Sequence, residues 1–222
     1  MKKIMMTLAA VAVAATMNAQ MYIGGSLGYS NTKSDNGTVG VKATEEYTTN
    51  MFVFAPEFGY KLDDKMAVGI AIEFGTGSRE TKWVGTGAAP LKYTKPSTTT
   101  FAINPYLRYQ VLSFGKANIF VDGGLNFQLS KDKEVGFDAK GNTYDNKASM
   151  DLGLFVTPGV SFDINENWSI VAKLDKMFTL GYSKGAVADL DGAPDAPTNF
   201  NVGFSTGGFQ LGSLRFGVYY NF

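Results

Sequence analysis

Seven charged side chains recur at alternate positions inside otherwise apolar segments, and their types and spacing are those that could do chemistry. They are four acids and three bases, namely Glu57, Glu73, Arg108, Asp122, Lys173, Asp175 and Arg215. Paired carboxylates such as Glu57 and Glu73 could serve as the acid and base of glycoside hydrolysis. Here they alternate with Arg and Lys, and cations close to a carboxylate favour its charged form, so we expect no catalytic acid among them.

The other residue types exclude further chemistry. The chain contains neither Cys nor His, which rules out disulfides, thiolate metal sites, cysteine nucleophiles and Ser/His/Asp triads. In the last long polar segment Asp189, Asp191 and Asp195 lack the ligand spacing and the closing Glu of a calcium loop. We therefore expect no catalytic residue, no metal site and no cofactor in this chain.

The seven charges are better explained as buried ion pairs. Neighbouring segments would place Glu73 beside Arg108, Arg108 beside Asp122, and Asp175 or Lys173 beside Arg215. Buried charges need partners, and this favours a structural network that plugs the interior of the fold. The alternative, a gated path for protons or ions along the same residues, stays open.

The segments that carry these charges alternate apolar and polar residues with a period of two, which is typical of β-strands with two unlike faces. Eight such segments are predicted, over residues 21–30, 52–62, 66–75, 101–111, 119–129, 152–162, 168–174 and 214–222. Three connections are short (63–65, 113–116 and 165–167) and four are long and polar (roughly 31–46, 76–96, 131–148 and 183–208). The sequence therefore predicts an all-β fold, an eight-stranded antiparallel up-and-down transmembrane barrel with short periplasmic turns and four long extracellular loops.

The composition of the two strand faces indicates which of them meets lipid. One face is apolar, and the other is rich in glycine and small residues with charges between them. A strand surface in water would favour Thr, Lys and Glu over glycine, so we expect the apolar face to contact lipid. Pro56, Pro105 and Pro158 on that face lack the N–H of a strand ladder and predict β-bulges. A soluble carrier of a hydrophobic ligand would instead need the apolar face inside.

The first residues have the pattern of an export signal. Lys2 and Lys3 precede the apolar stretch Ile4–Ala15 and a short segment that ends at Ala19, the charged, apolar and cleavage regions of a signal peptide. We predict a signal peptide over residues 1–19 and a barrel domain over residues 20–222.

The net charge of the predicted barrel domain is small. Cleavage of the signal peptide would remove Lys2 and Lys3, which leaves 18 basic and 20 acidic residues and a net charge of −2, too small to imply an electrostatic partner. With 18% charged residues, nucleic-acid binding is not expected either.

The chain ends on an aromatic strand, Arg215-Phe216-Gly217-Val218-Tyr219-Tyr220-Asn221-Phe222. With the alternating segments before it, from Met21 onward, the chain resembles the small outer-membrane β-barrels of the OmpA-domain and OmpX type, a porin-like family. The resemblance implies a Gram-negative outer membrane and no catalytic residues. It implies lipid and lipopolysaccharide as neighbours, with periplasmic chaperones and the barrel-assembly machinery as partners during biogenesis. Tyr220 and Phe222 would then belong to the assembly signal.

Two functions are compatible with this pattern. We expect a non-enzymatic integral outer-membrane barrel with a structural or surface-interaction role, an ion-paired plugged interior and long loops that could bind an unknown extracellular ligand. The alternative is a small passive diffusion channel, porin-like, for ions or small solutes. Conductance across a bilayer distinguishes the two.

Overall fold

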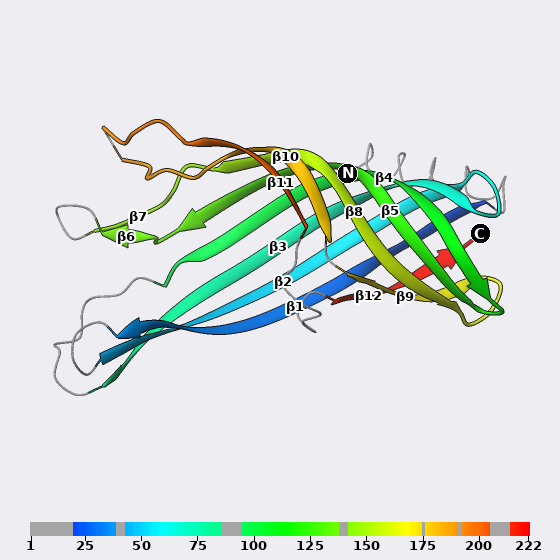
Figure 1. Cartoon of the computed structure of the whole chain (residues 1–222), viewed down its shortest axis with the longest axis horizontal. Helices are drawn as coiled ribbons and strands as arrows, with labels where there is room; N and C mark the ends of the chain where they lie inside the picture. Colours follow the sequence, from blue (N-terminus) through cyan, green and yellow to red (C-terminus); the bar gives the residue numbers. More distant parts are fainter. Residues whose placement is uncertain are drawn as a thin grey trace, which may run out of the picture.

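The computed structural model describes residues 20–38, 43–85, 95–137, 142–174, 176–190, 192–204 and 214–222. The regular elements of these residues are strands (Figure 1). They are β1 (Met21–Thr38), β2 (Ala43–Lys61), β3 (Met66–Gly85), β4 (Ser97–Phe114), β5 (Ala117–Lys133), β6 (Gly136–Phe137), β7 (Thr143–Tyr144), β8 (Ser149–Asp163), β9 (Trp168–Leu174), β10 (Phe178–Lys184), β11 (Thr198–Phe204) and β12 (Leu214–Asn221). Within the described ranges no helical segment has the length and hydrophobicity that a bilayer crossing requires.

The strands close into a barrel in which neighbours are antiparallel. Pairing runs from β1 through β2, β3, β4 and β5 to β8, β9 and β12, and β12 pairs again with β1. β10 and β11 belong to the seventh and eighth passages of the chain at the long-loop end, where β10 pairs with both β8 and β11. The predicted fold class, an eight-stranded antiparallel barrel, is therefore confirmed.

The strands extend beyond the segments that hydrophobicity predicts. β1 and β2 run on through most of the expected loop 31–46, and β3 runs through about the first half of the expected loop 76–96, and in both regions the strands still pair with each other. β11 lies inside the expected loop 183–208, and β6 and β7 form a small hairpin within 131–148. Polar pairs such as Thr32 opposite Thr49 continue the ladder there, because β-branched side chains favour strands in water as well as in lipid.

Tight turns join the strands at the other end of the barrel, as predicted. In the β2–β3 turn Asp63 Oδ1 accepts hydrogen bonds from the backbone N–H of Lys65 and Met66, at 2.7 Å each. Asn165 accepts two backbone hydrogen bonds in the β8–β9 turn in the same way. Gly115, between β4 and β5, has a φ of 61°, a left-handed conformation that suits glycine. These local contacts set the register of each hairpin and so the level at which its inner-face charges lie.

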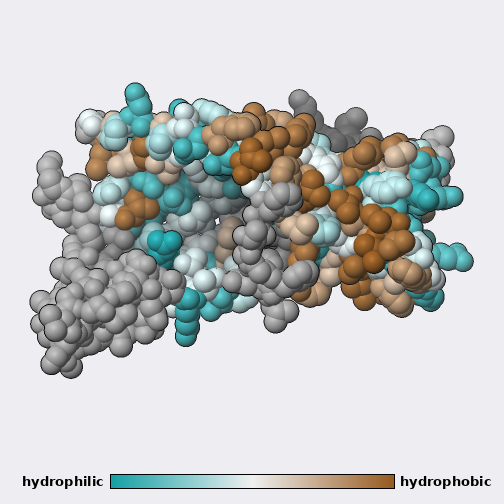
Figure 2. All heavy atoms as spheres, viewed as in Figure 1, coloured by the Kyte–Doolittle hydropathy of each residue, from teal (hydrophilic) through white to brown (hydrophobic). Residues whose placement is uncertain are grey.

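The apolar face points outward and the small and charged residues point into the barrel. Phe54, Leu125 and Phe216 keep 45%, 42% and 58% of their surface exposed, whereas Ala55 and Ala102 are buried inside. Figure 2 shows hydrophobic residues gathered over the outer surface of the half of the molecule that holds the short turns. An outward apolar band is the arrangement of a barrel in lipid. A soluble carrier, which needs the apolar face inside, does not fit this arrangement.

Of the three prolines of the outer face, Pro56 and Pro105 do not mark β-bulges, so that prediction is wrong for them, whereas an irregularity of the pairing does lie beside Pro158. The ladders on both sides of Pro56 and Pro105 keep one register past the proline. Beside Pro56, for instance, pairing between β2 and β3 stops after Phe54 and resumes at Glu57 in the same register. A proline removes one ladder hydrogen bond but inserts no residue, so the strand keeps its course. At Pro158 the β5–β8 ladder is regular, but on the other side of β8 the register changes by two residues between the pair Val156–Phe178 and the pair Gly159–Lys173.

Candidate functional site

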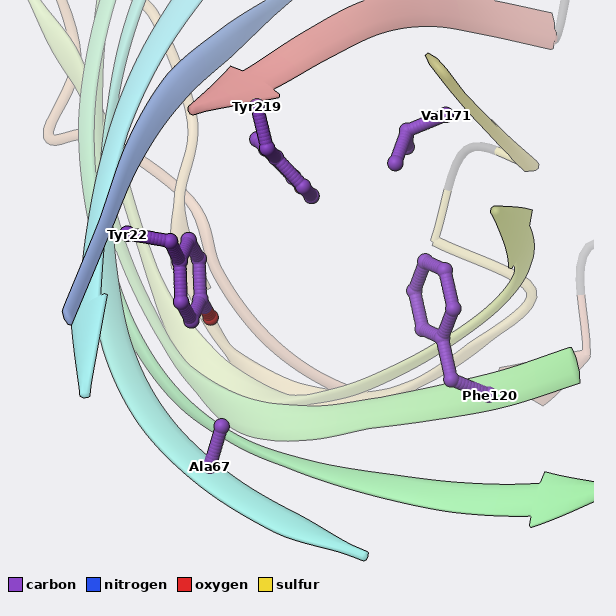
Figure 3. Packing of buried hydrophobic residues seen from close by; sticks show 5 residues of the cluster. All are labelled: Tyr22, Ala67, Phe120, Val171 and Tyr219. Carbon is purple, nitrogen blue, oxygen red and sulfur yellow. The ribbon is translucent and has the colours of Figure 1, made fainter. Parts of the chain in front are cut away.

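A cluster of four charged and four aromatic side chains lies inside the barrel at one level, and we call it the interior plug. Its members come from the inner faces of six strands: Tyr22, Glu57, Tyr106, Arg108, Phe120, Asp122, Lys173 and Tyr219. The Arg108 side chain is 12% exposed, and the other seven residues are at most 7% exposed. Figure 3 shows Tyr22, Phe120 and Tyr219 converging on the lumen from separate strands.

Glu57, on β2, is the acceptor around which the plug is arranged. Its Oε1 lies 2.5 Å from Lys173 Nζ. Its Oε2 accepts hydrogen bonds from the hydroxyls of Tyr219 and Tyr106 at 2.8 and 3.1 Å, and Arg108 Nη2 lies 3.7 Å from the same oxygen. Charge-assisted hydrogen bonds of this kind compensate a carboxylate for the water it loses on burial.

Asp122, on β5, is the second acid of the plug and forms its bidentate pair. Arg108 Nε and Nη2 donate to the two carboxylate oxygens of Asp122 at 2.7 and 2.8 Å. Lys173 Nζ lies 3.6 Å from Asp122 as well. Each acid therefore contacts both bases, and the four charges sum to zero, which is the condition under which buried charges are tolerated.

Aromatic rings enclose the guanidinium of Arg108. Its Cζ lies 4.0 Å from the centroid of Phe120, and the rings of Tyr219, Tyr106 and Tyr22 follow at 5.1, 5.3 and 5.6 Å. The hydroxyls of Tyr22 and Tyr106 share a hydrogen bond of 2.8 Å. A guanidinium stacked on rings is attracted by their π faces, so the aromatic residues hold the cation from several sides.

Each of the four rings lies over a glycine of the neighbouring strand. The directly opposed pairs are Tyr22 with Gly59, Tyr106 with Gly69, Phe120 with Gly159, and Tyr219 with Gly24. A Cβ on any of these glycines would come within 2.1 to 2.6 Å of the ring. The glycines of the inner face thus make room for the aromatic rings, a role that their abundance in the sequence did not specify.

A second group of charges, the outer charge layer, lies on the long-loop side of the plug. Arg215 Nη1 contacts Glu73 Oε1 at 2.8 Å, and Lys176 Nζ lies 4.0 Å from Glu73 Oε2. Lys176 also donates to Asn126 Oδ1 at 2.5 Å. Sequence reasoning missed Lys176, which follows the end of β9 and lies outside the period-two pattern.

The structure changes part of the predicted charge network. Arg108 pairs with Asp122 as expected, but Glu73 pairs with Arg215 and not with Arg108. Lys173 is the cross-strand neighbour of Arg215, yet its amine reaches across to Glu57. The reason is the stagger of a tilted barrel, which shifts inner-face levels from strand to strand. Asp175 lies outside the described residues.

The plug separates two cavities of the lumen. On the short-turn side a cavity of about 410 Å³ reaches Arg108, Phe120 and Tyr219. On the other side a cavity of about 30 Å³ lies between the plug and the outer charge layer. Within the described ranges no group of three Asp or Glu side chains is arranged to hold a metal ion.

The final strand ends in an aromatic cluster on the outer face. The ring of Tyr220 lies 5.0 Å from Trp168 and 5.0 Å from Phe222, centroid to centroid, with edge-on geometry. The backbone N–H of Phe222 donates to Met21 O at 3.0 Å. The two residues of the expected assembly signal are therefore at the seam where the last strand meets the first.

Comparison with known proteins identifies the family. The chain is similar to the solved structure of Neisserial surface protein A (NspA), with 15% sequence identity and a TM-score of 0.43, over 91% of this chain and 97% of NspA. It is also similar to the outer membrane protein OprG from Pseudomonas aeruginosa, with 15% identity and a TM-score of 0.48, over 91% of this chain and 95% of OprG. No curated protein matches the chain. The model of the outer membrane protein beta-barrel domain matches residues 4–222, and the chain therefore belongs to this family of outer-membrane β-barrel proteins.

Proposed function

We propose that this outer-membrane barrel is a non-enzymatic protein with a structural or surface-interaction role, and that its lumen is closed to ions. The observation that supports this proposal is the interior plug, in which Glu57 and Asp122 are each held by both Arg108 and Lys173. Eight strands enclose a lumen that side chains alone can fill. The buried rings around these charges leave the plug without an open water column.

The same contacts argue against catalysis. A general acid or base has to reach a substrate, but the Glu57 and Asp122 carboxylates are almost completely buried and already bound to bases. Glu73, the remaining acid of the expected network in the described residues, contacts Arg215 and lies close to Lys176. These three acids are therefore engaged in holding the barrel together.

Conductance tests the closed lumen. The full chain, refolded and inserted into a planar bilayer, is expected to give no steady conductance. The double variant Tyr22→Ala/Tyr219→Ala removes two sealing rings and serves as the control that a leak at this level can be detected. A steady conductance of the parent that rises with salt concentration would support the small diffusion channel and overturn the closed lumen.

We also propose lipopolysaccharide as the lipid partner of the outer rim. On β5 the outward apolar residues run from Ile119 to Leu129, ten positions that span about 33 Å at about 3.3 Å per residue. A strand tilt of about 40° reduces this length to about 25 Å, the height of a lipid-facing band. Lys131 and Lys133 follow directly, and Lys184 of β10 is level with Leu129 through their shared partner Met150.

These three exposed lysines, the lysine rim, carry charges suited to the phosphates of lipopolysaccharide. Among the described residues no carboxylate lies within 4.0 Å of the amines of Lys131, Lys133 or Lys184. A basic side chain near an anionic lipid surface contributes about 1 kcal/mol. The position and the charge of the rim therefore support binding of anionic headgroups at the edge of the band.

Vesicles with and without lipopolysaccharide test the lysine rim. We expect lipopolysaccharide to raise the free energy of unfolding of the parent, and Lys131→Gln/Lys133→Gln/Lys184→Gln to lose most of that gain. Lys65→Gln, a change of an exposed lysine in a short turn at the opposite end, is the matched control and should keep it. An equal gain in the parent and the triple variant would show that the rim does not bind this lipid.

A further inference from the structure

A small cavity separates the interior plug from the outer charge layer. It has a volume of about 30 Å³ and is lined by Ser26, Ala55, Ala71 and Asn104, together with charged residues of both layers. Ser26 is the cross-strand partner of Ala55, and Asn104 that of Ala71. Because two alanines face the lumen between the two polar residues, their short side chains leave this space open.

The polar side chains of this cavity lack hydrogen-bond partners. Within the described part of the chain, neither Nδ2 nor Oδ1 of Asn104 has a partner, and Ser26 Oγ has none. Both residues are only 2% exposed, so bulk water does not reach them. Leaving a buried donor and acceptor unsatisfied costs free energy, and native proteins almost always satisfy such groups with protein atoms or with ordered water.

The chemistry of the cavity favours water over an ion. An amide presents a donor and an acceptor at once, and a cation would satisfy only Oδ1 of Asn104 whereas an anion would satisfy only Nδ2. The charged side chains that line the cavity are also balanced, three acids against three bases: Glu57, Glu73, Asp122, Lys173, Lys176 and Arg215. One water molecule needs at least roughly 10 to 15 Å³ of such space and occupies about 30 Å³ in the liquid, so the cavity of about 30 Å³ accommodates one or two.

We propose that Asn104 and Ser26 form an internal water-binding site that holds one or two ordered water molecules between the interior plug and the outer charge layer. The water donates to Asn104 Oδ1 and accepts from Asn104 Nδ2 or Ser26 Oγ. The interior then has two regions of different character, a plug sealed by aromatic rings and a hydrated layer next to it. This site goes beyond the proposed surface role and does not depend on it.

A crystal structure of the refolded chain at high resolution tests the site. One or two density peaks are expected at about 2.7 to 3.2 Å from the Asn104 amide, with one of them within that range of Ser26 Oγ. Crystals grown with rubidium bromide should show no anomalous signal there, because the occupant is neutral. An anomalous peak in the cavity would identify an ion and overturn the proposal. A cavity without density, or an Asn104 amide turned to bond protein atoms directly, would overturn it as well.

Two variants test which residues hold the water. Asn104→Leu keeps the branched shape of the side chain and removes both polar atoms, so the peaks should be lost while Lys173 still contacts Glu57. Ser26→Ala, the milder change, should lose only the contact at position 26 and keep the water at Asn104. If Asn104→Leu does not fold, the loss of the contact at position 26 in Ser26→Ala still tests the site. Peaks that persist unchanged in Asn104→Leu would show that the charged residues hold the water and would refute the assignment to Asn104. Loss of the water at Asn104 in Ser26→Ala would refute the division of roles between the two residues.

Discussion

Tyr22 lies directly opposite Gly59 on the adjacent strands β1 and β2, and a Cβ atom at position 59 would come to 2.1 Å from Tyr22 Cζ. The Tyr22 ring can therefore point into the lumen only because position 59 carries no side chain. Because Tyr22 shares a hydrogen bond with Tyr106, which donates to Glu57, this contact on one ladder supports the charges at the centre of the plug.

Gly59→Ala should destabilise the barrel by about 1 to 3 kcal/mol, the usual cost of overpacking a filled interior. The measurement is urea unfolding in lipid vesicles. Gly123→Ala is the matched control, because the nearest atom to a Cβ there is Phe155 O at 3.9 Å. If the two variants lose the same stability, the ring does not depend on the glycine.

Arg108→Ala should cost about 3 to 5 kcal/mol, because it leaves Asp122 and Glu57 with Lys173 alone in a buried site. The double variant Arg108→Leu/Asp122→Leu removes one charge of each sign and leaves Glu57 paired with Lys173. It should therefore lose less stability than the single variants Arg108→Leu and Asp122→Leu together, as a double-mutant cycle in vesicles would measure. A negligible loss in Arg108→Ala would indicate a wet lumen and favour the channel.

The sequence predicts the barrel well and the site only in part, for a physical reason. Period-two alternation and turn residues act over a few positions, so the strands and the hairpin pair of Arg108 with Asp122 follow from local pattern. The contact of Lys173 with Glu57 joins residues 116 positions apart, on strands that are not neighbours. Such contacts depend on strand tilt and on barrel closure, which no local pattern encodes.

The aromatic half of the plug shows the same limit. Tyr106 and Phe120 stand on the polar face of the alternation, but nothing in their own segments shows that four such rings meet around one guanidinium. A usable signal was the glycine opposite each ring, because a bulky inner-face residue beside a cross-strand glycine indicates close packing. The glycine opposite each ring can be identified only once the register of the two strands is known.

Leu125→Arg tests the lipid-facing band. Leu125 lies in the middle of the outward residues of β5, where a charge would sit near the bilayer midplane and cost about 2 to 4 kcal/mol of folding free energy in vesicles. Phe114→Arg is the matched control, since Phe114 ends β4 at the short turns and is 63% exposed. It should cost only about 0 to 1 kcal/mol. Equal costs at the two positions would contradict the assignment of the outer face.

Deletion of Phe222 separates assembly from stability. In the folded barrel the residue contributes one backbone hydrogen bond to Met21 and an edge-on contact with Tyr220, so its loss should cost only about 1 kcal/mol in vesicles. As the terminal aromatic of the last strand it is expected to guide recognition by the barrel-assembly machinery, and the amount of barrel in the outer membrane of cells should fall several-fold. Phe114→Ala removes an exposed aromatic at the same end of the barrel that is not terminal, and it should leave the yield unchanged. Equal yields from the parent and the truncated chain would refute an assembly role. If the truncated chain instead lost enough folding stability in vesicles to explain its lower yield, Phe222 would be a structural residue.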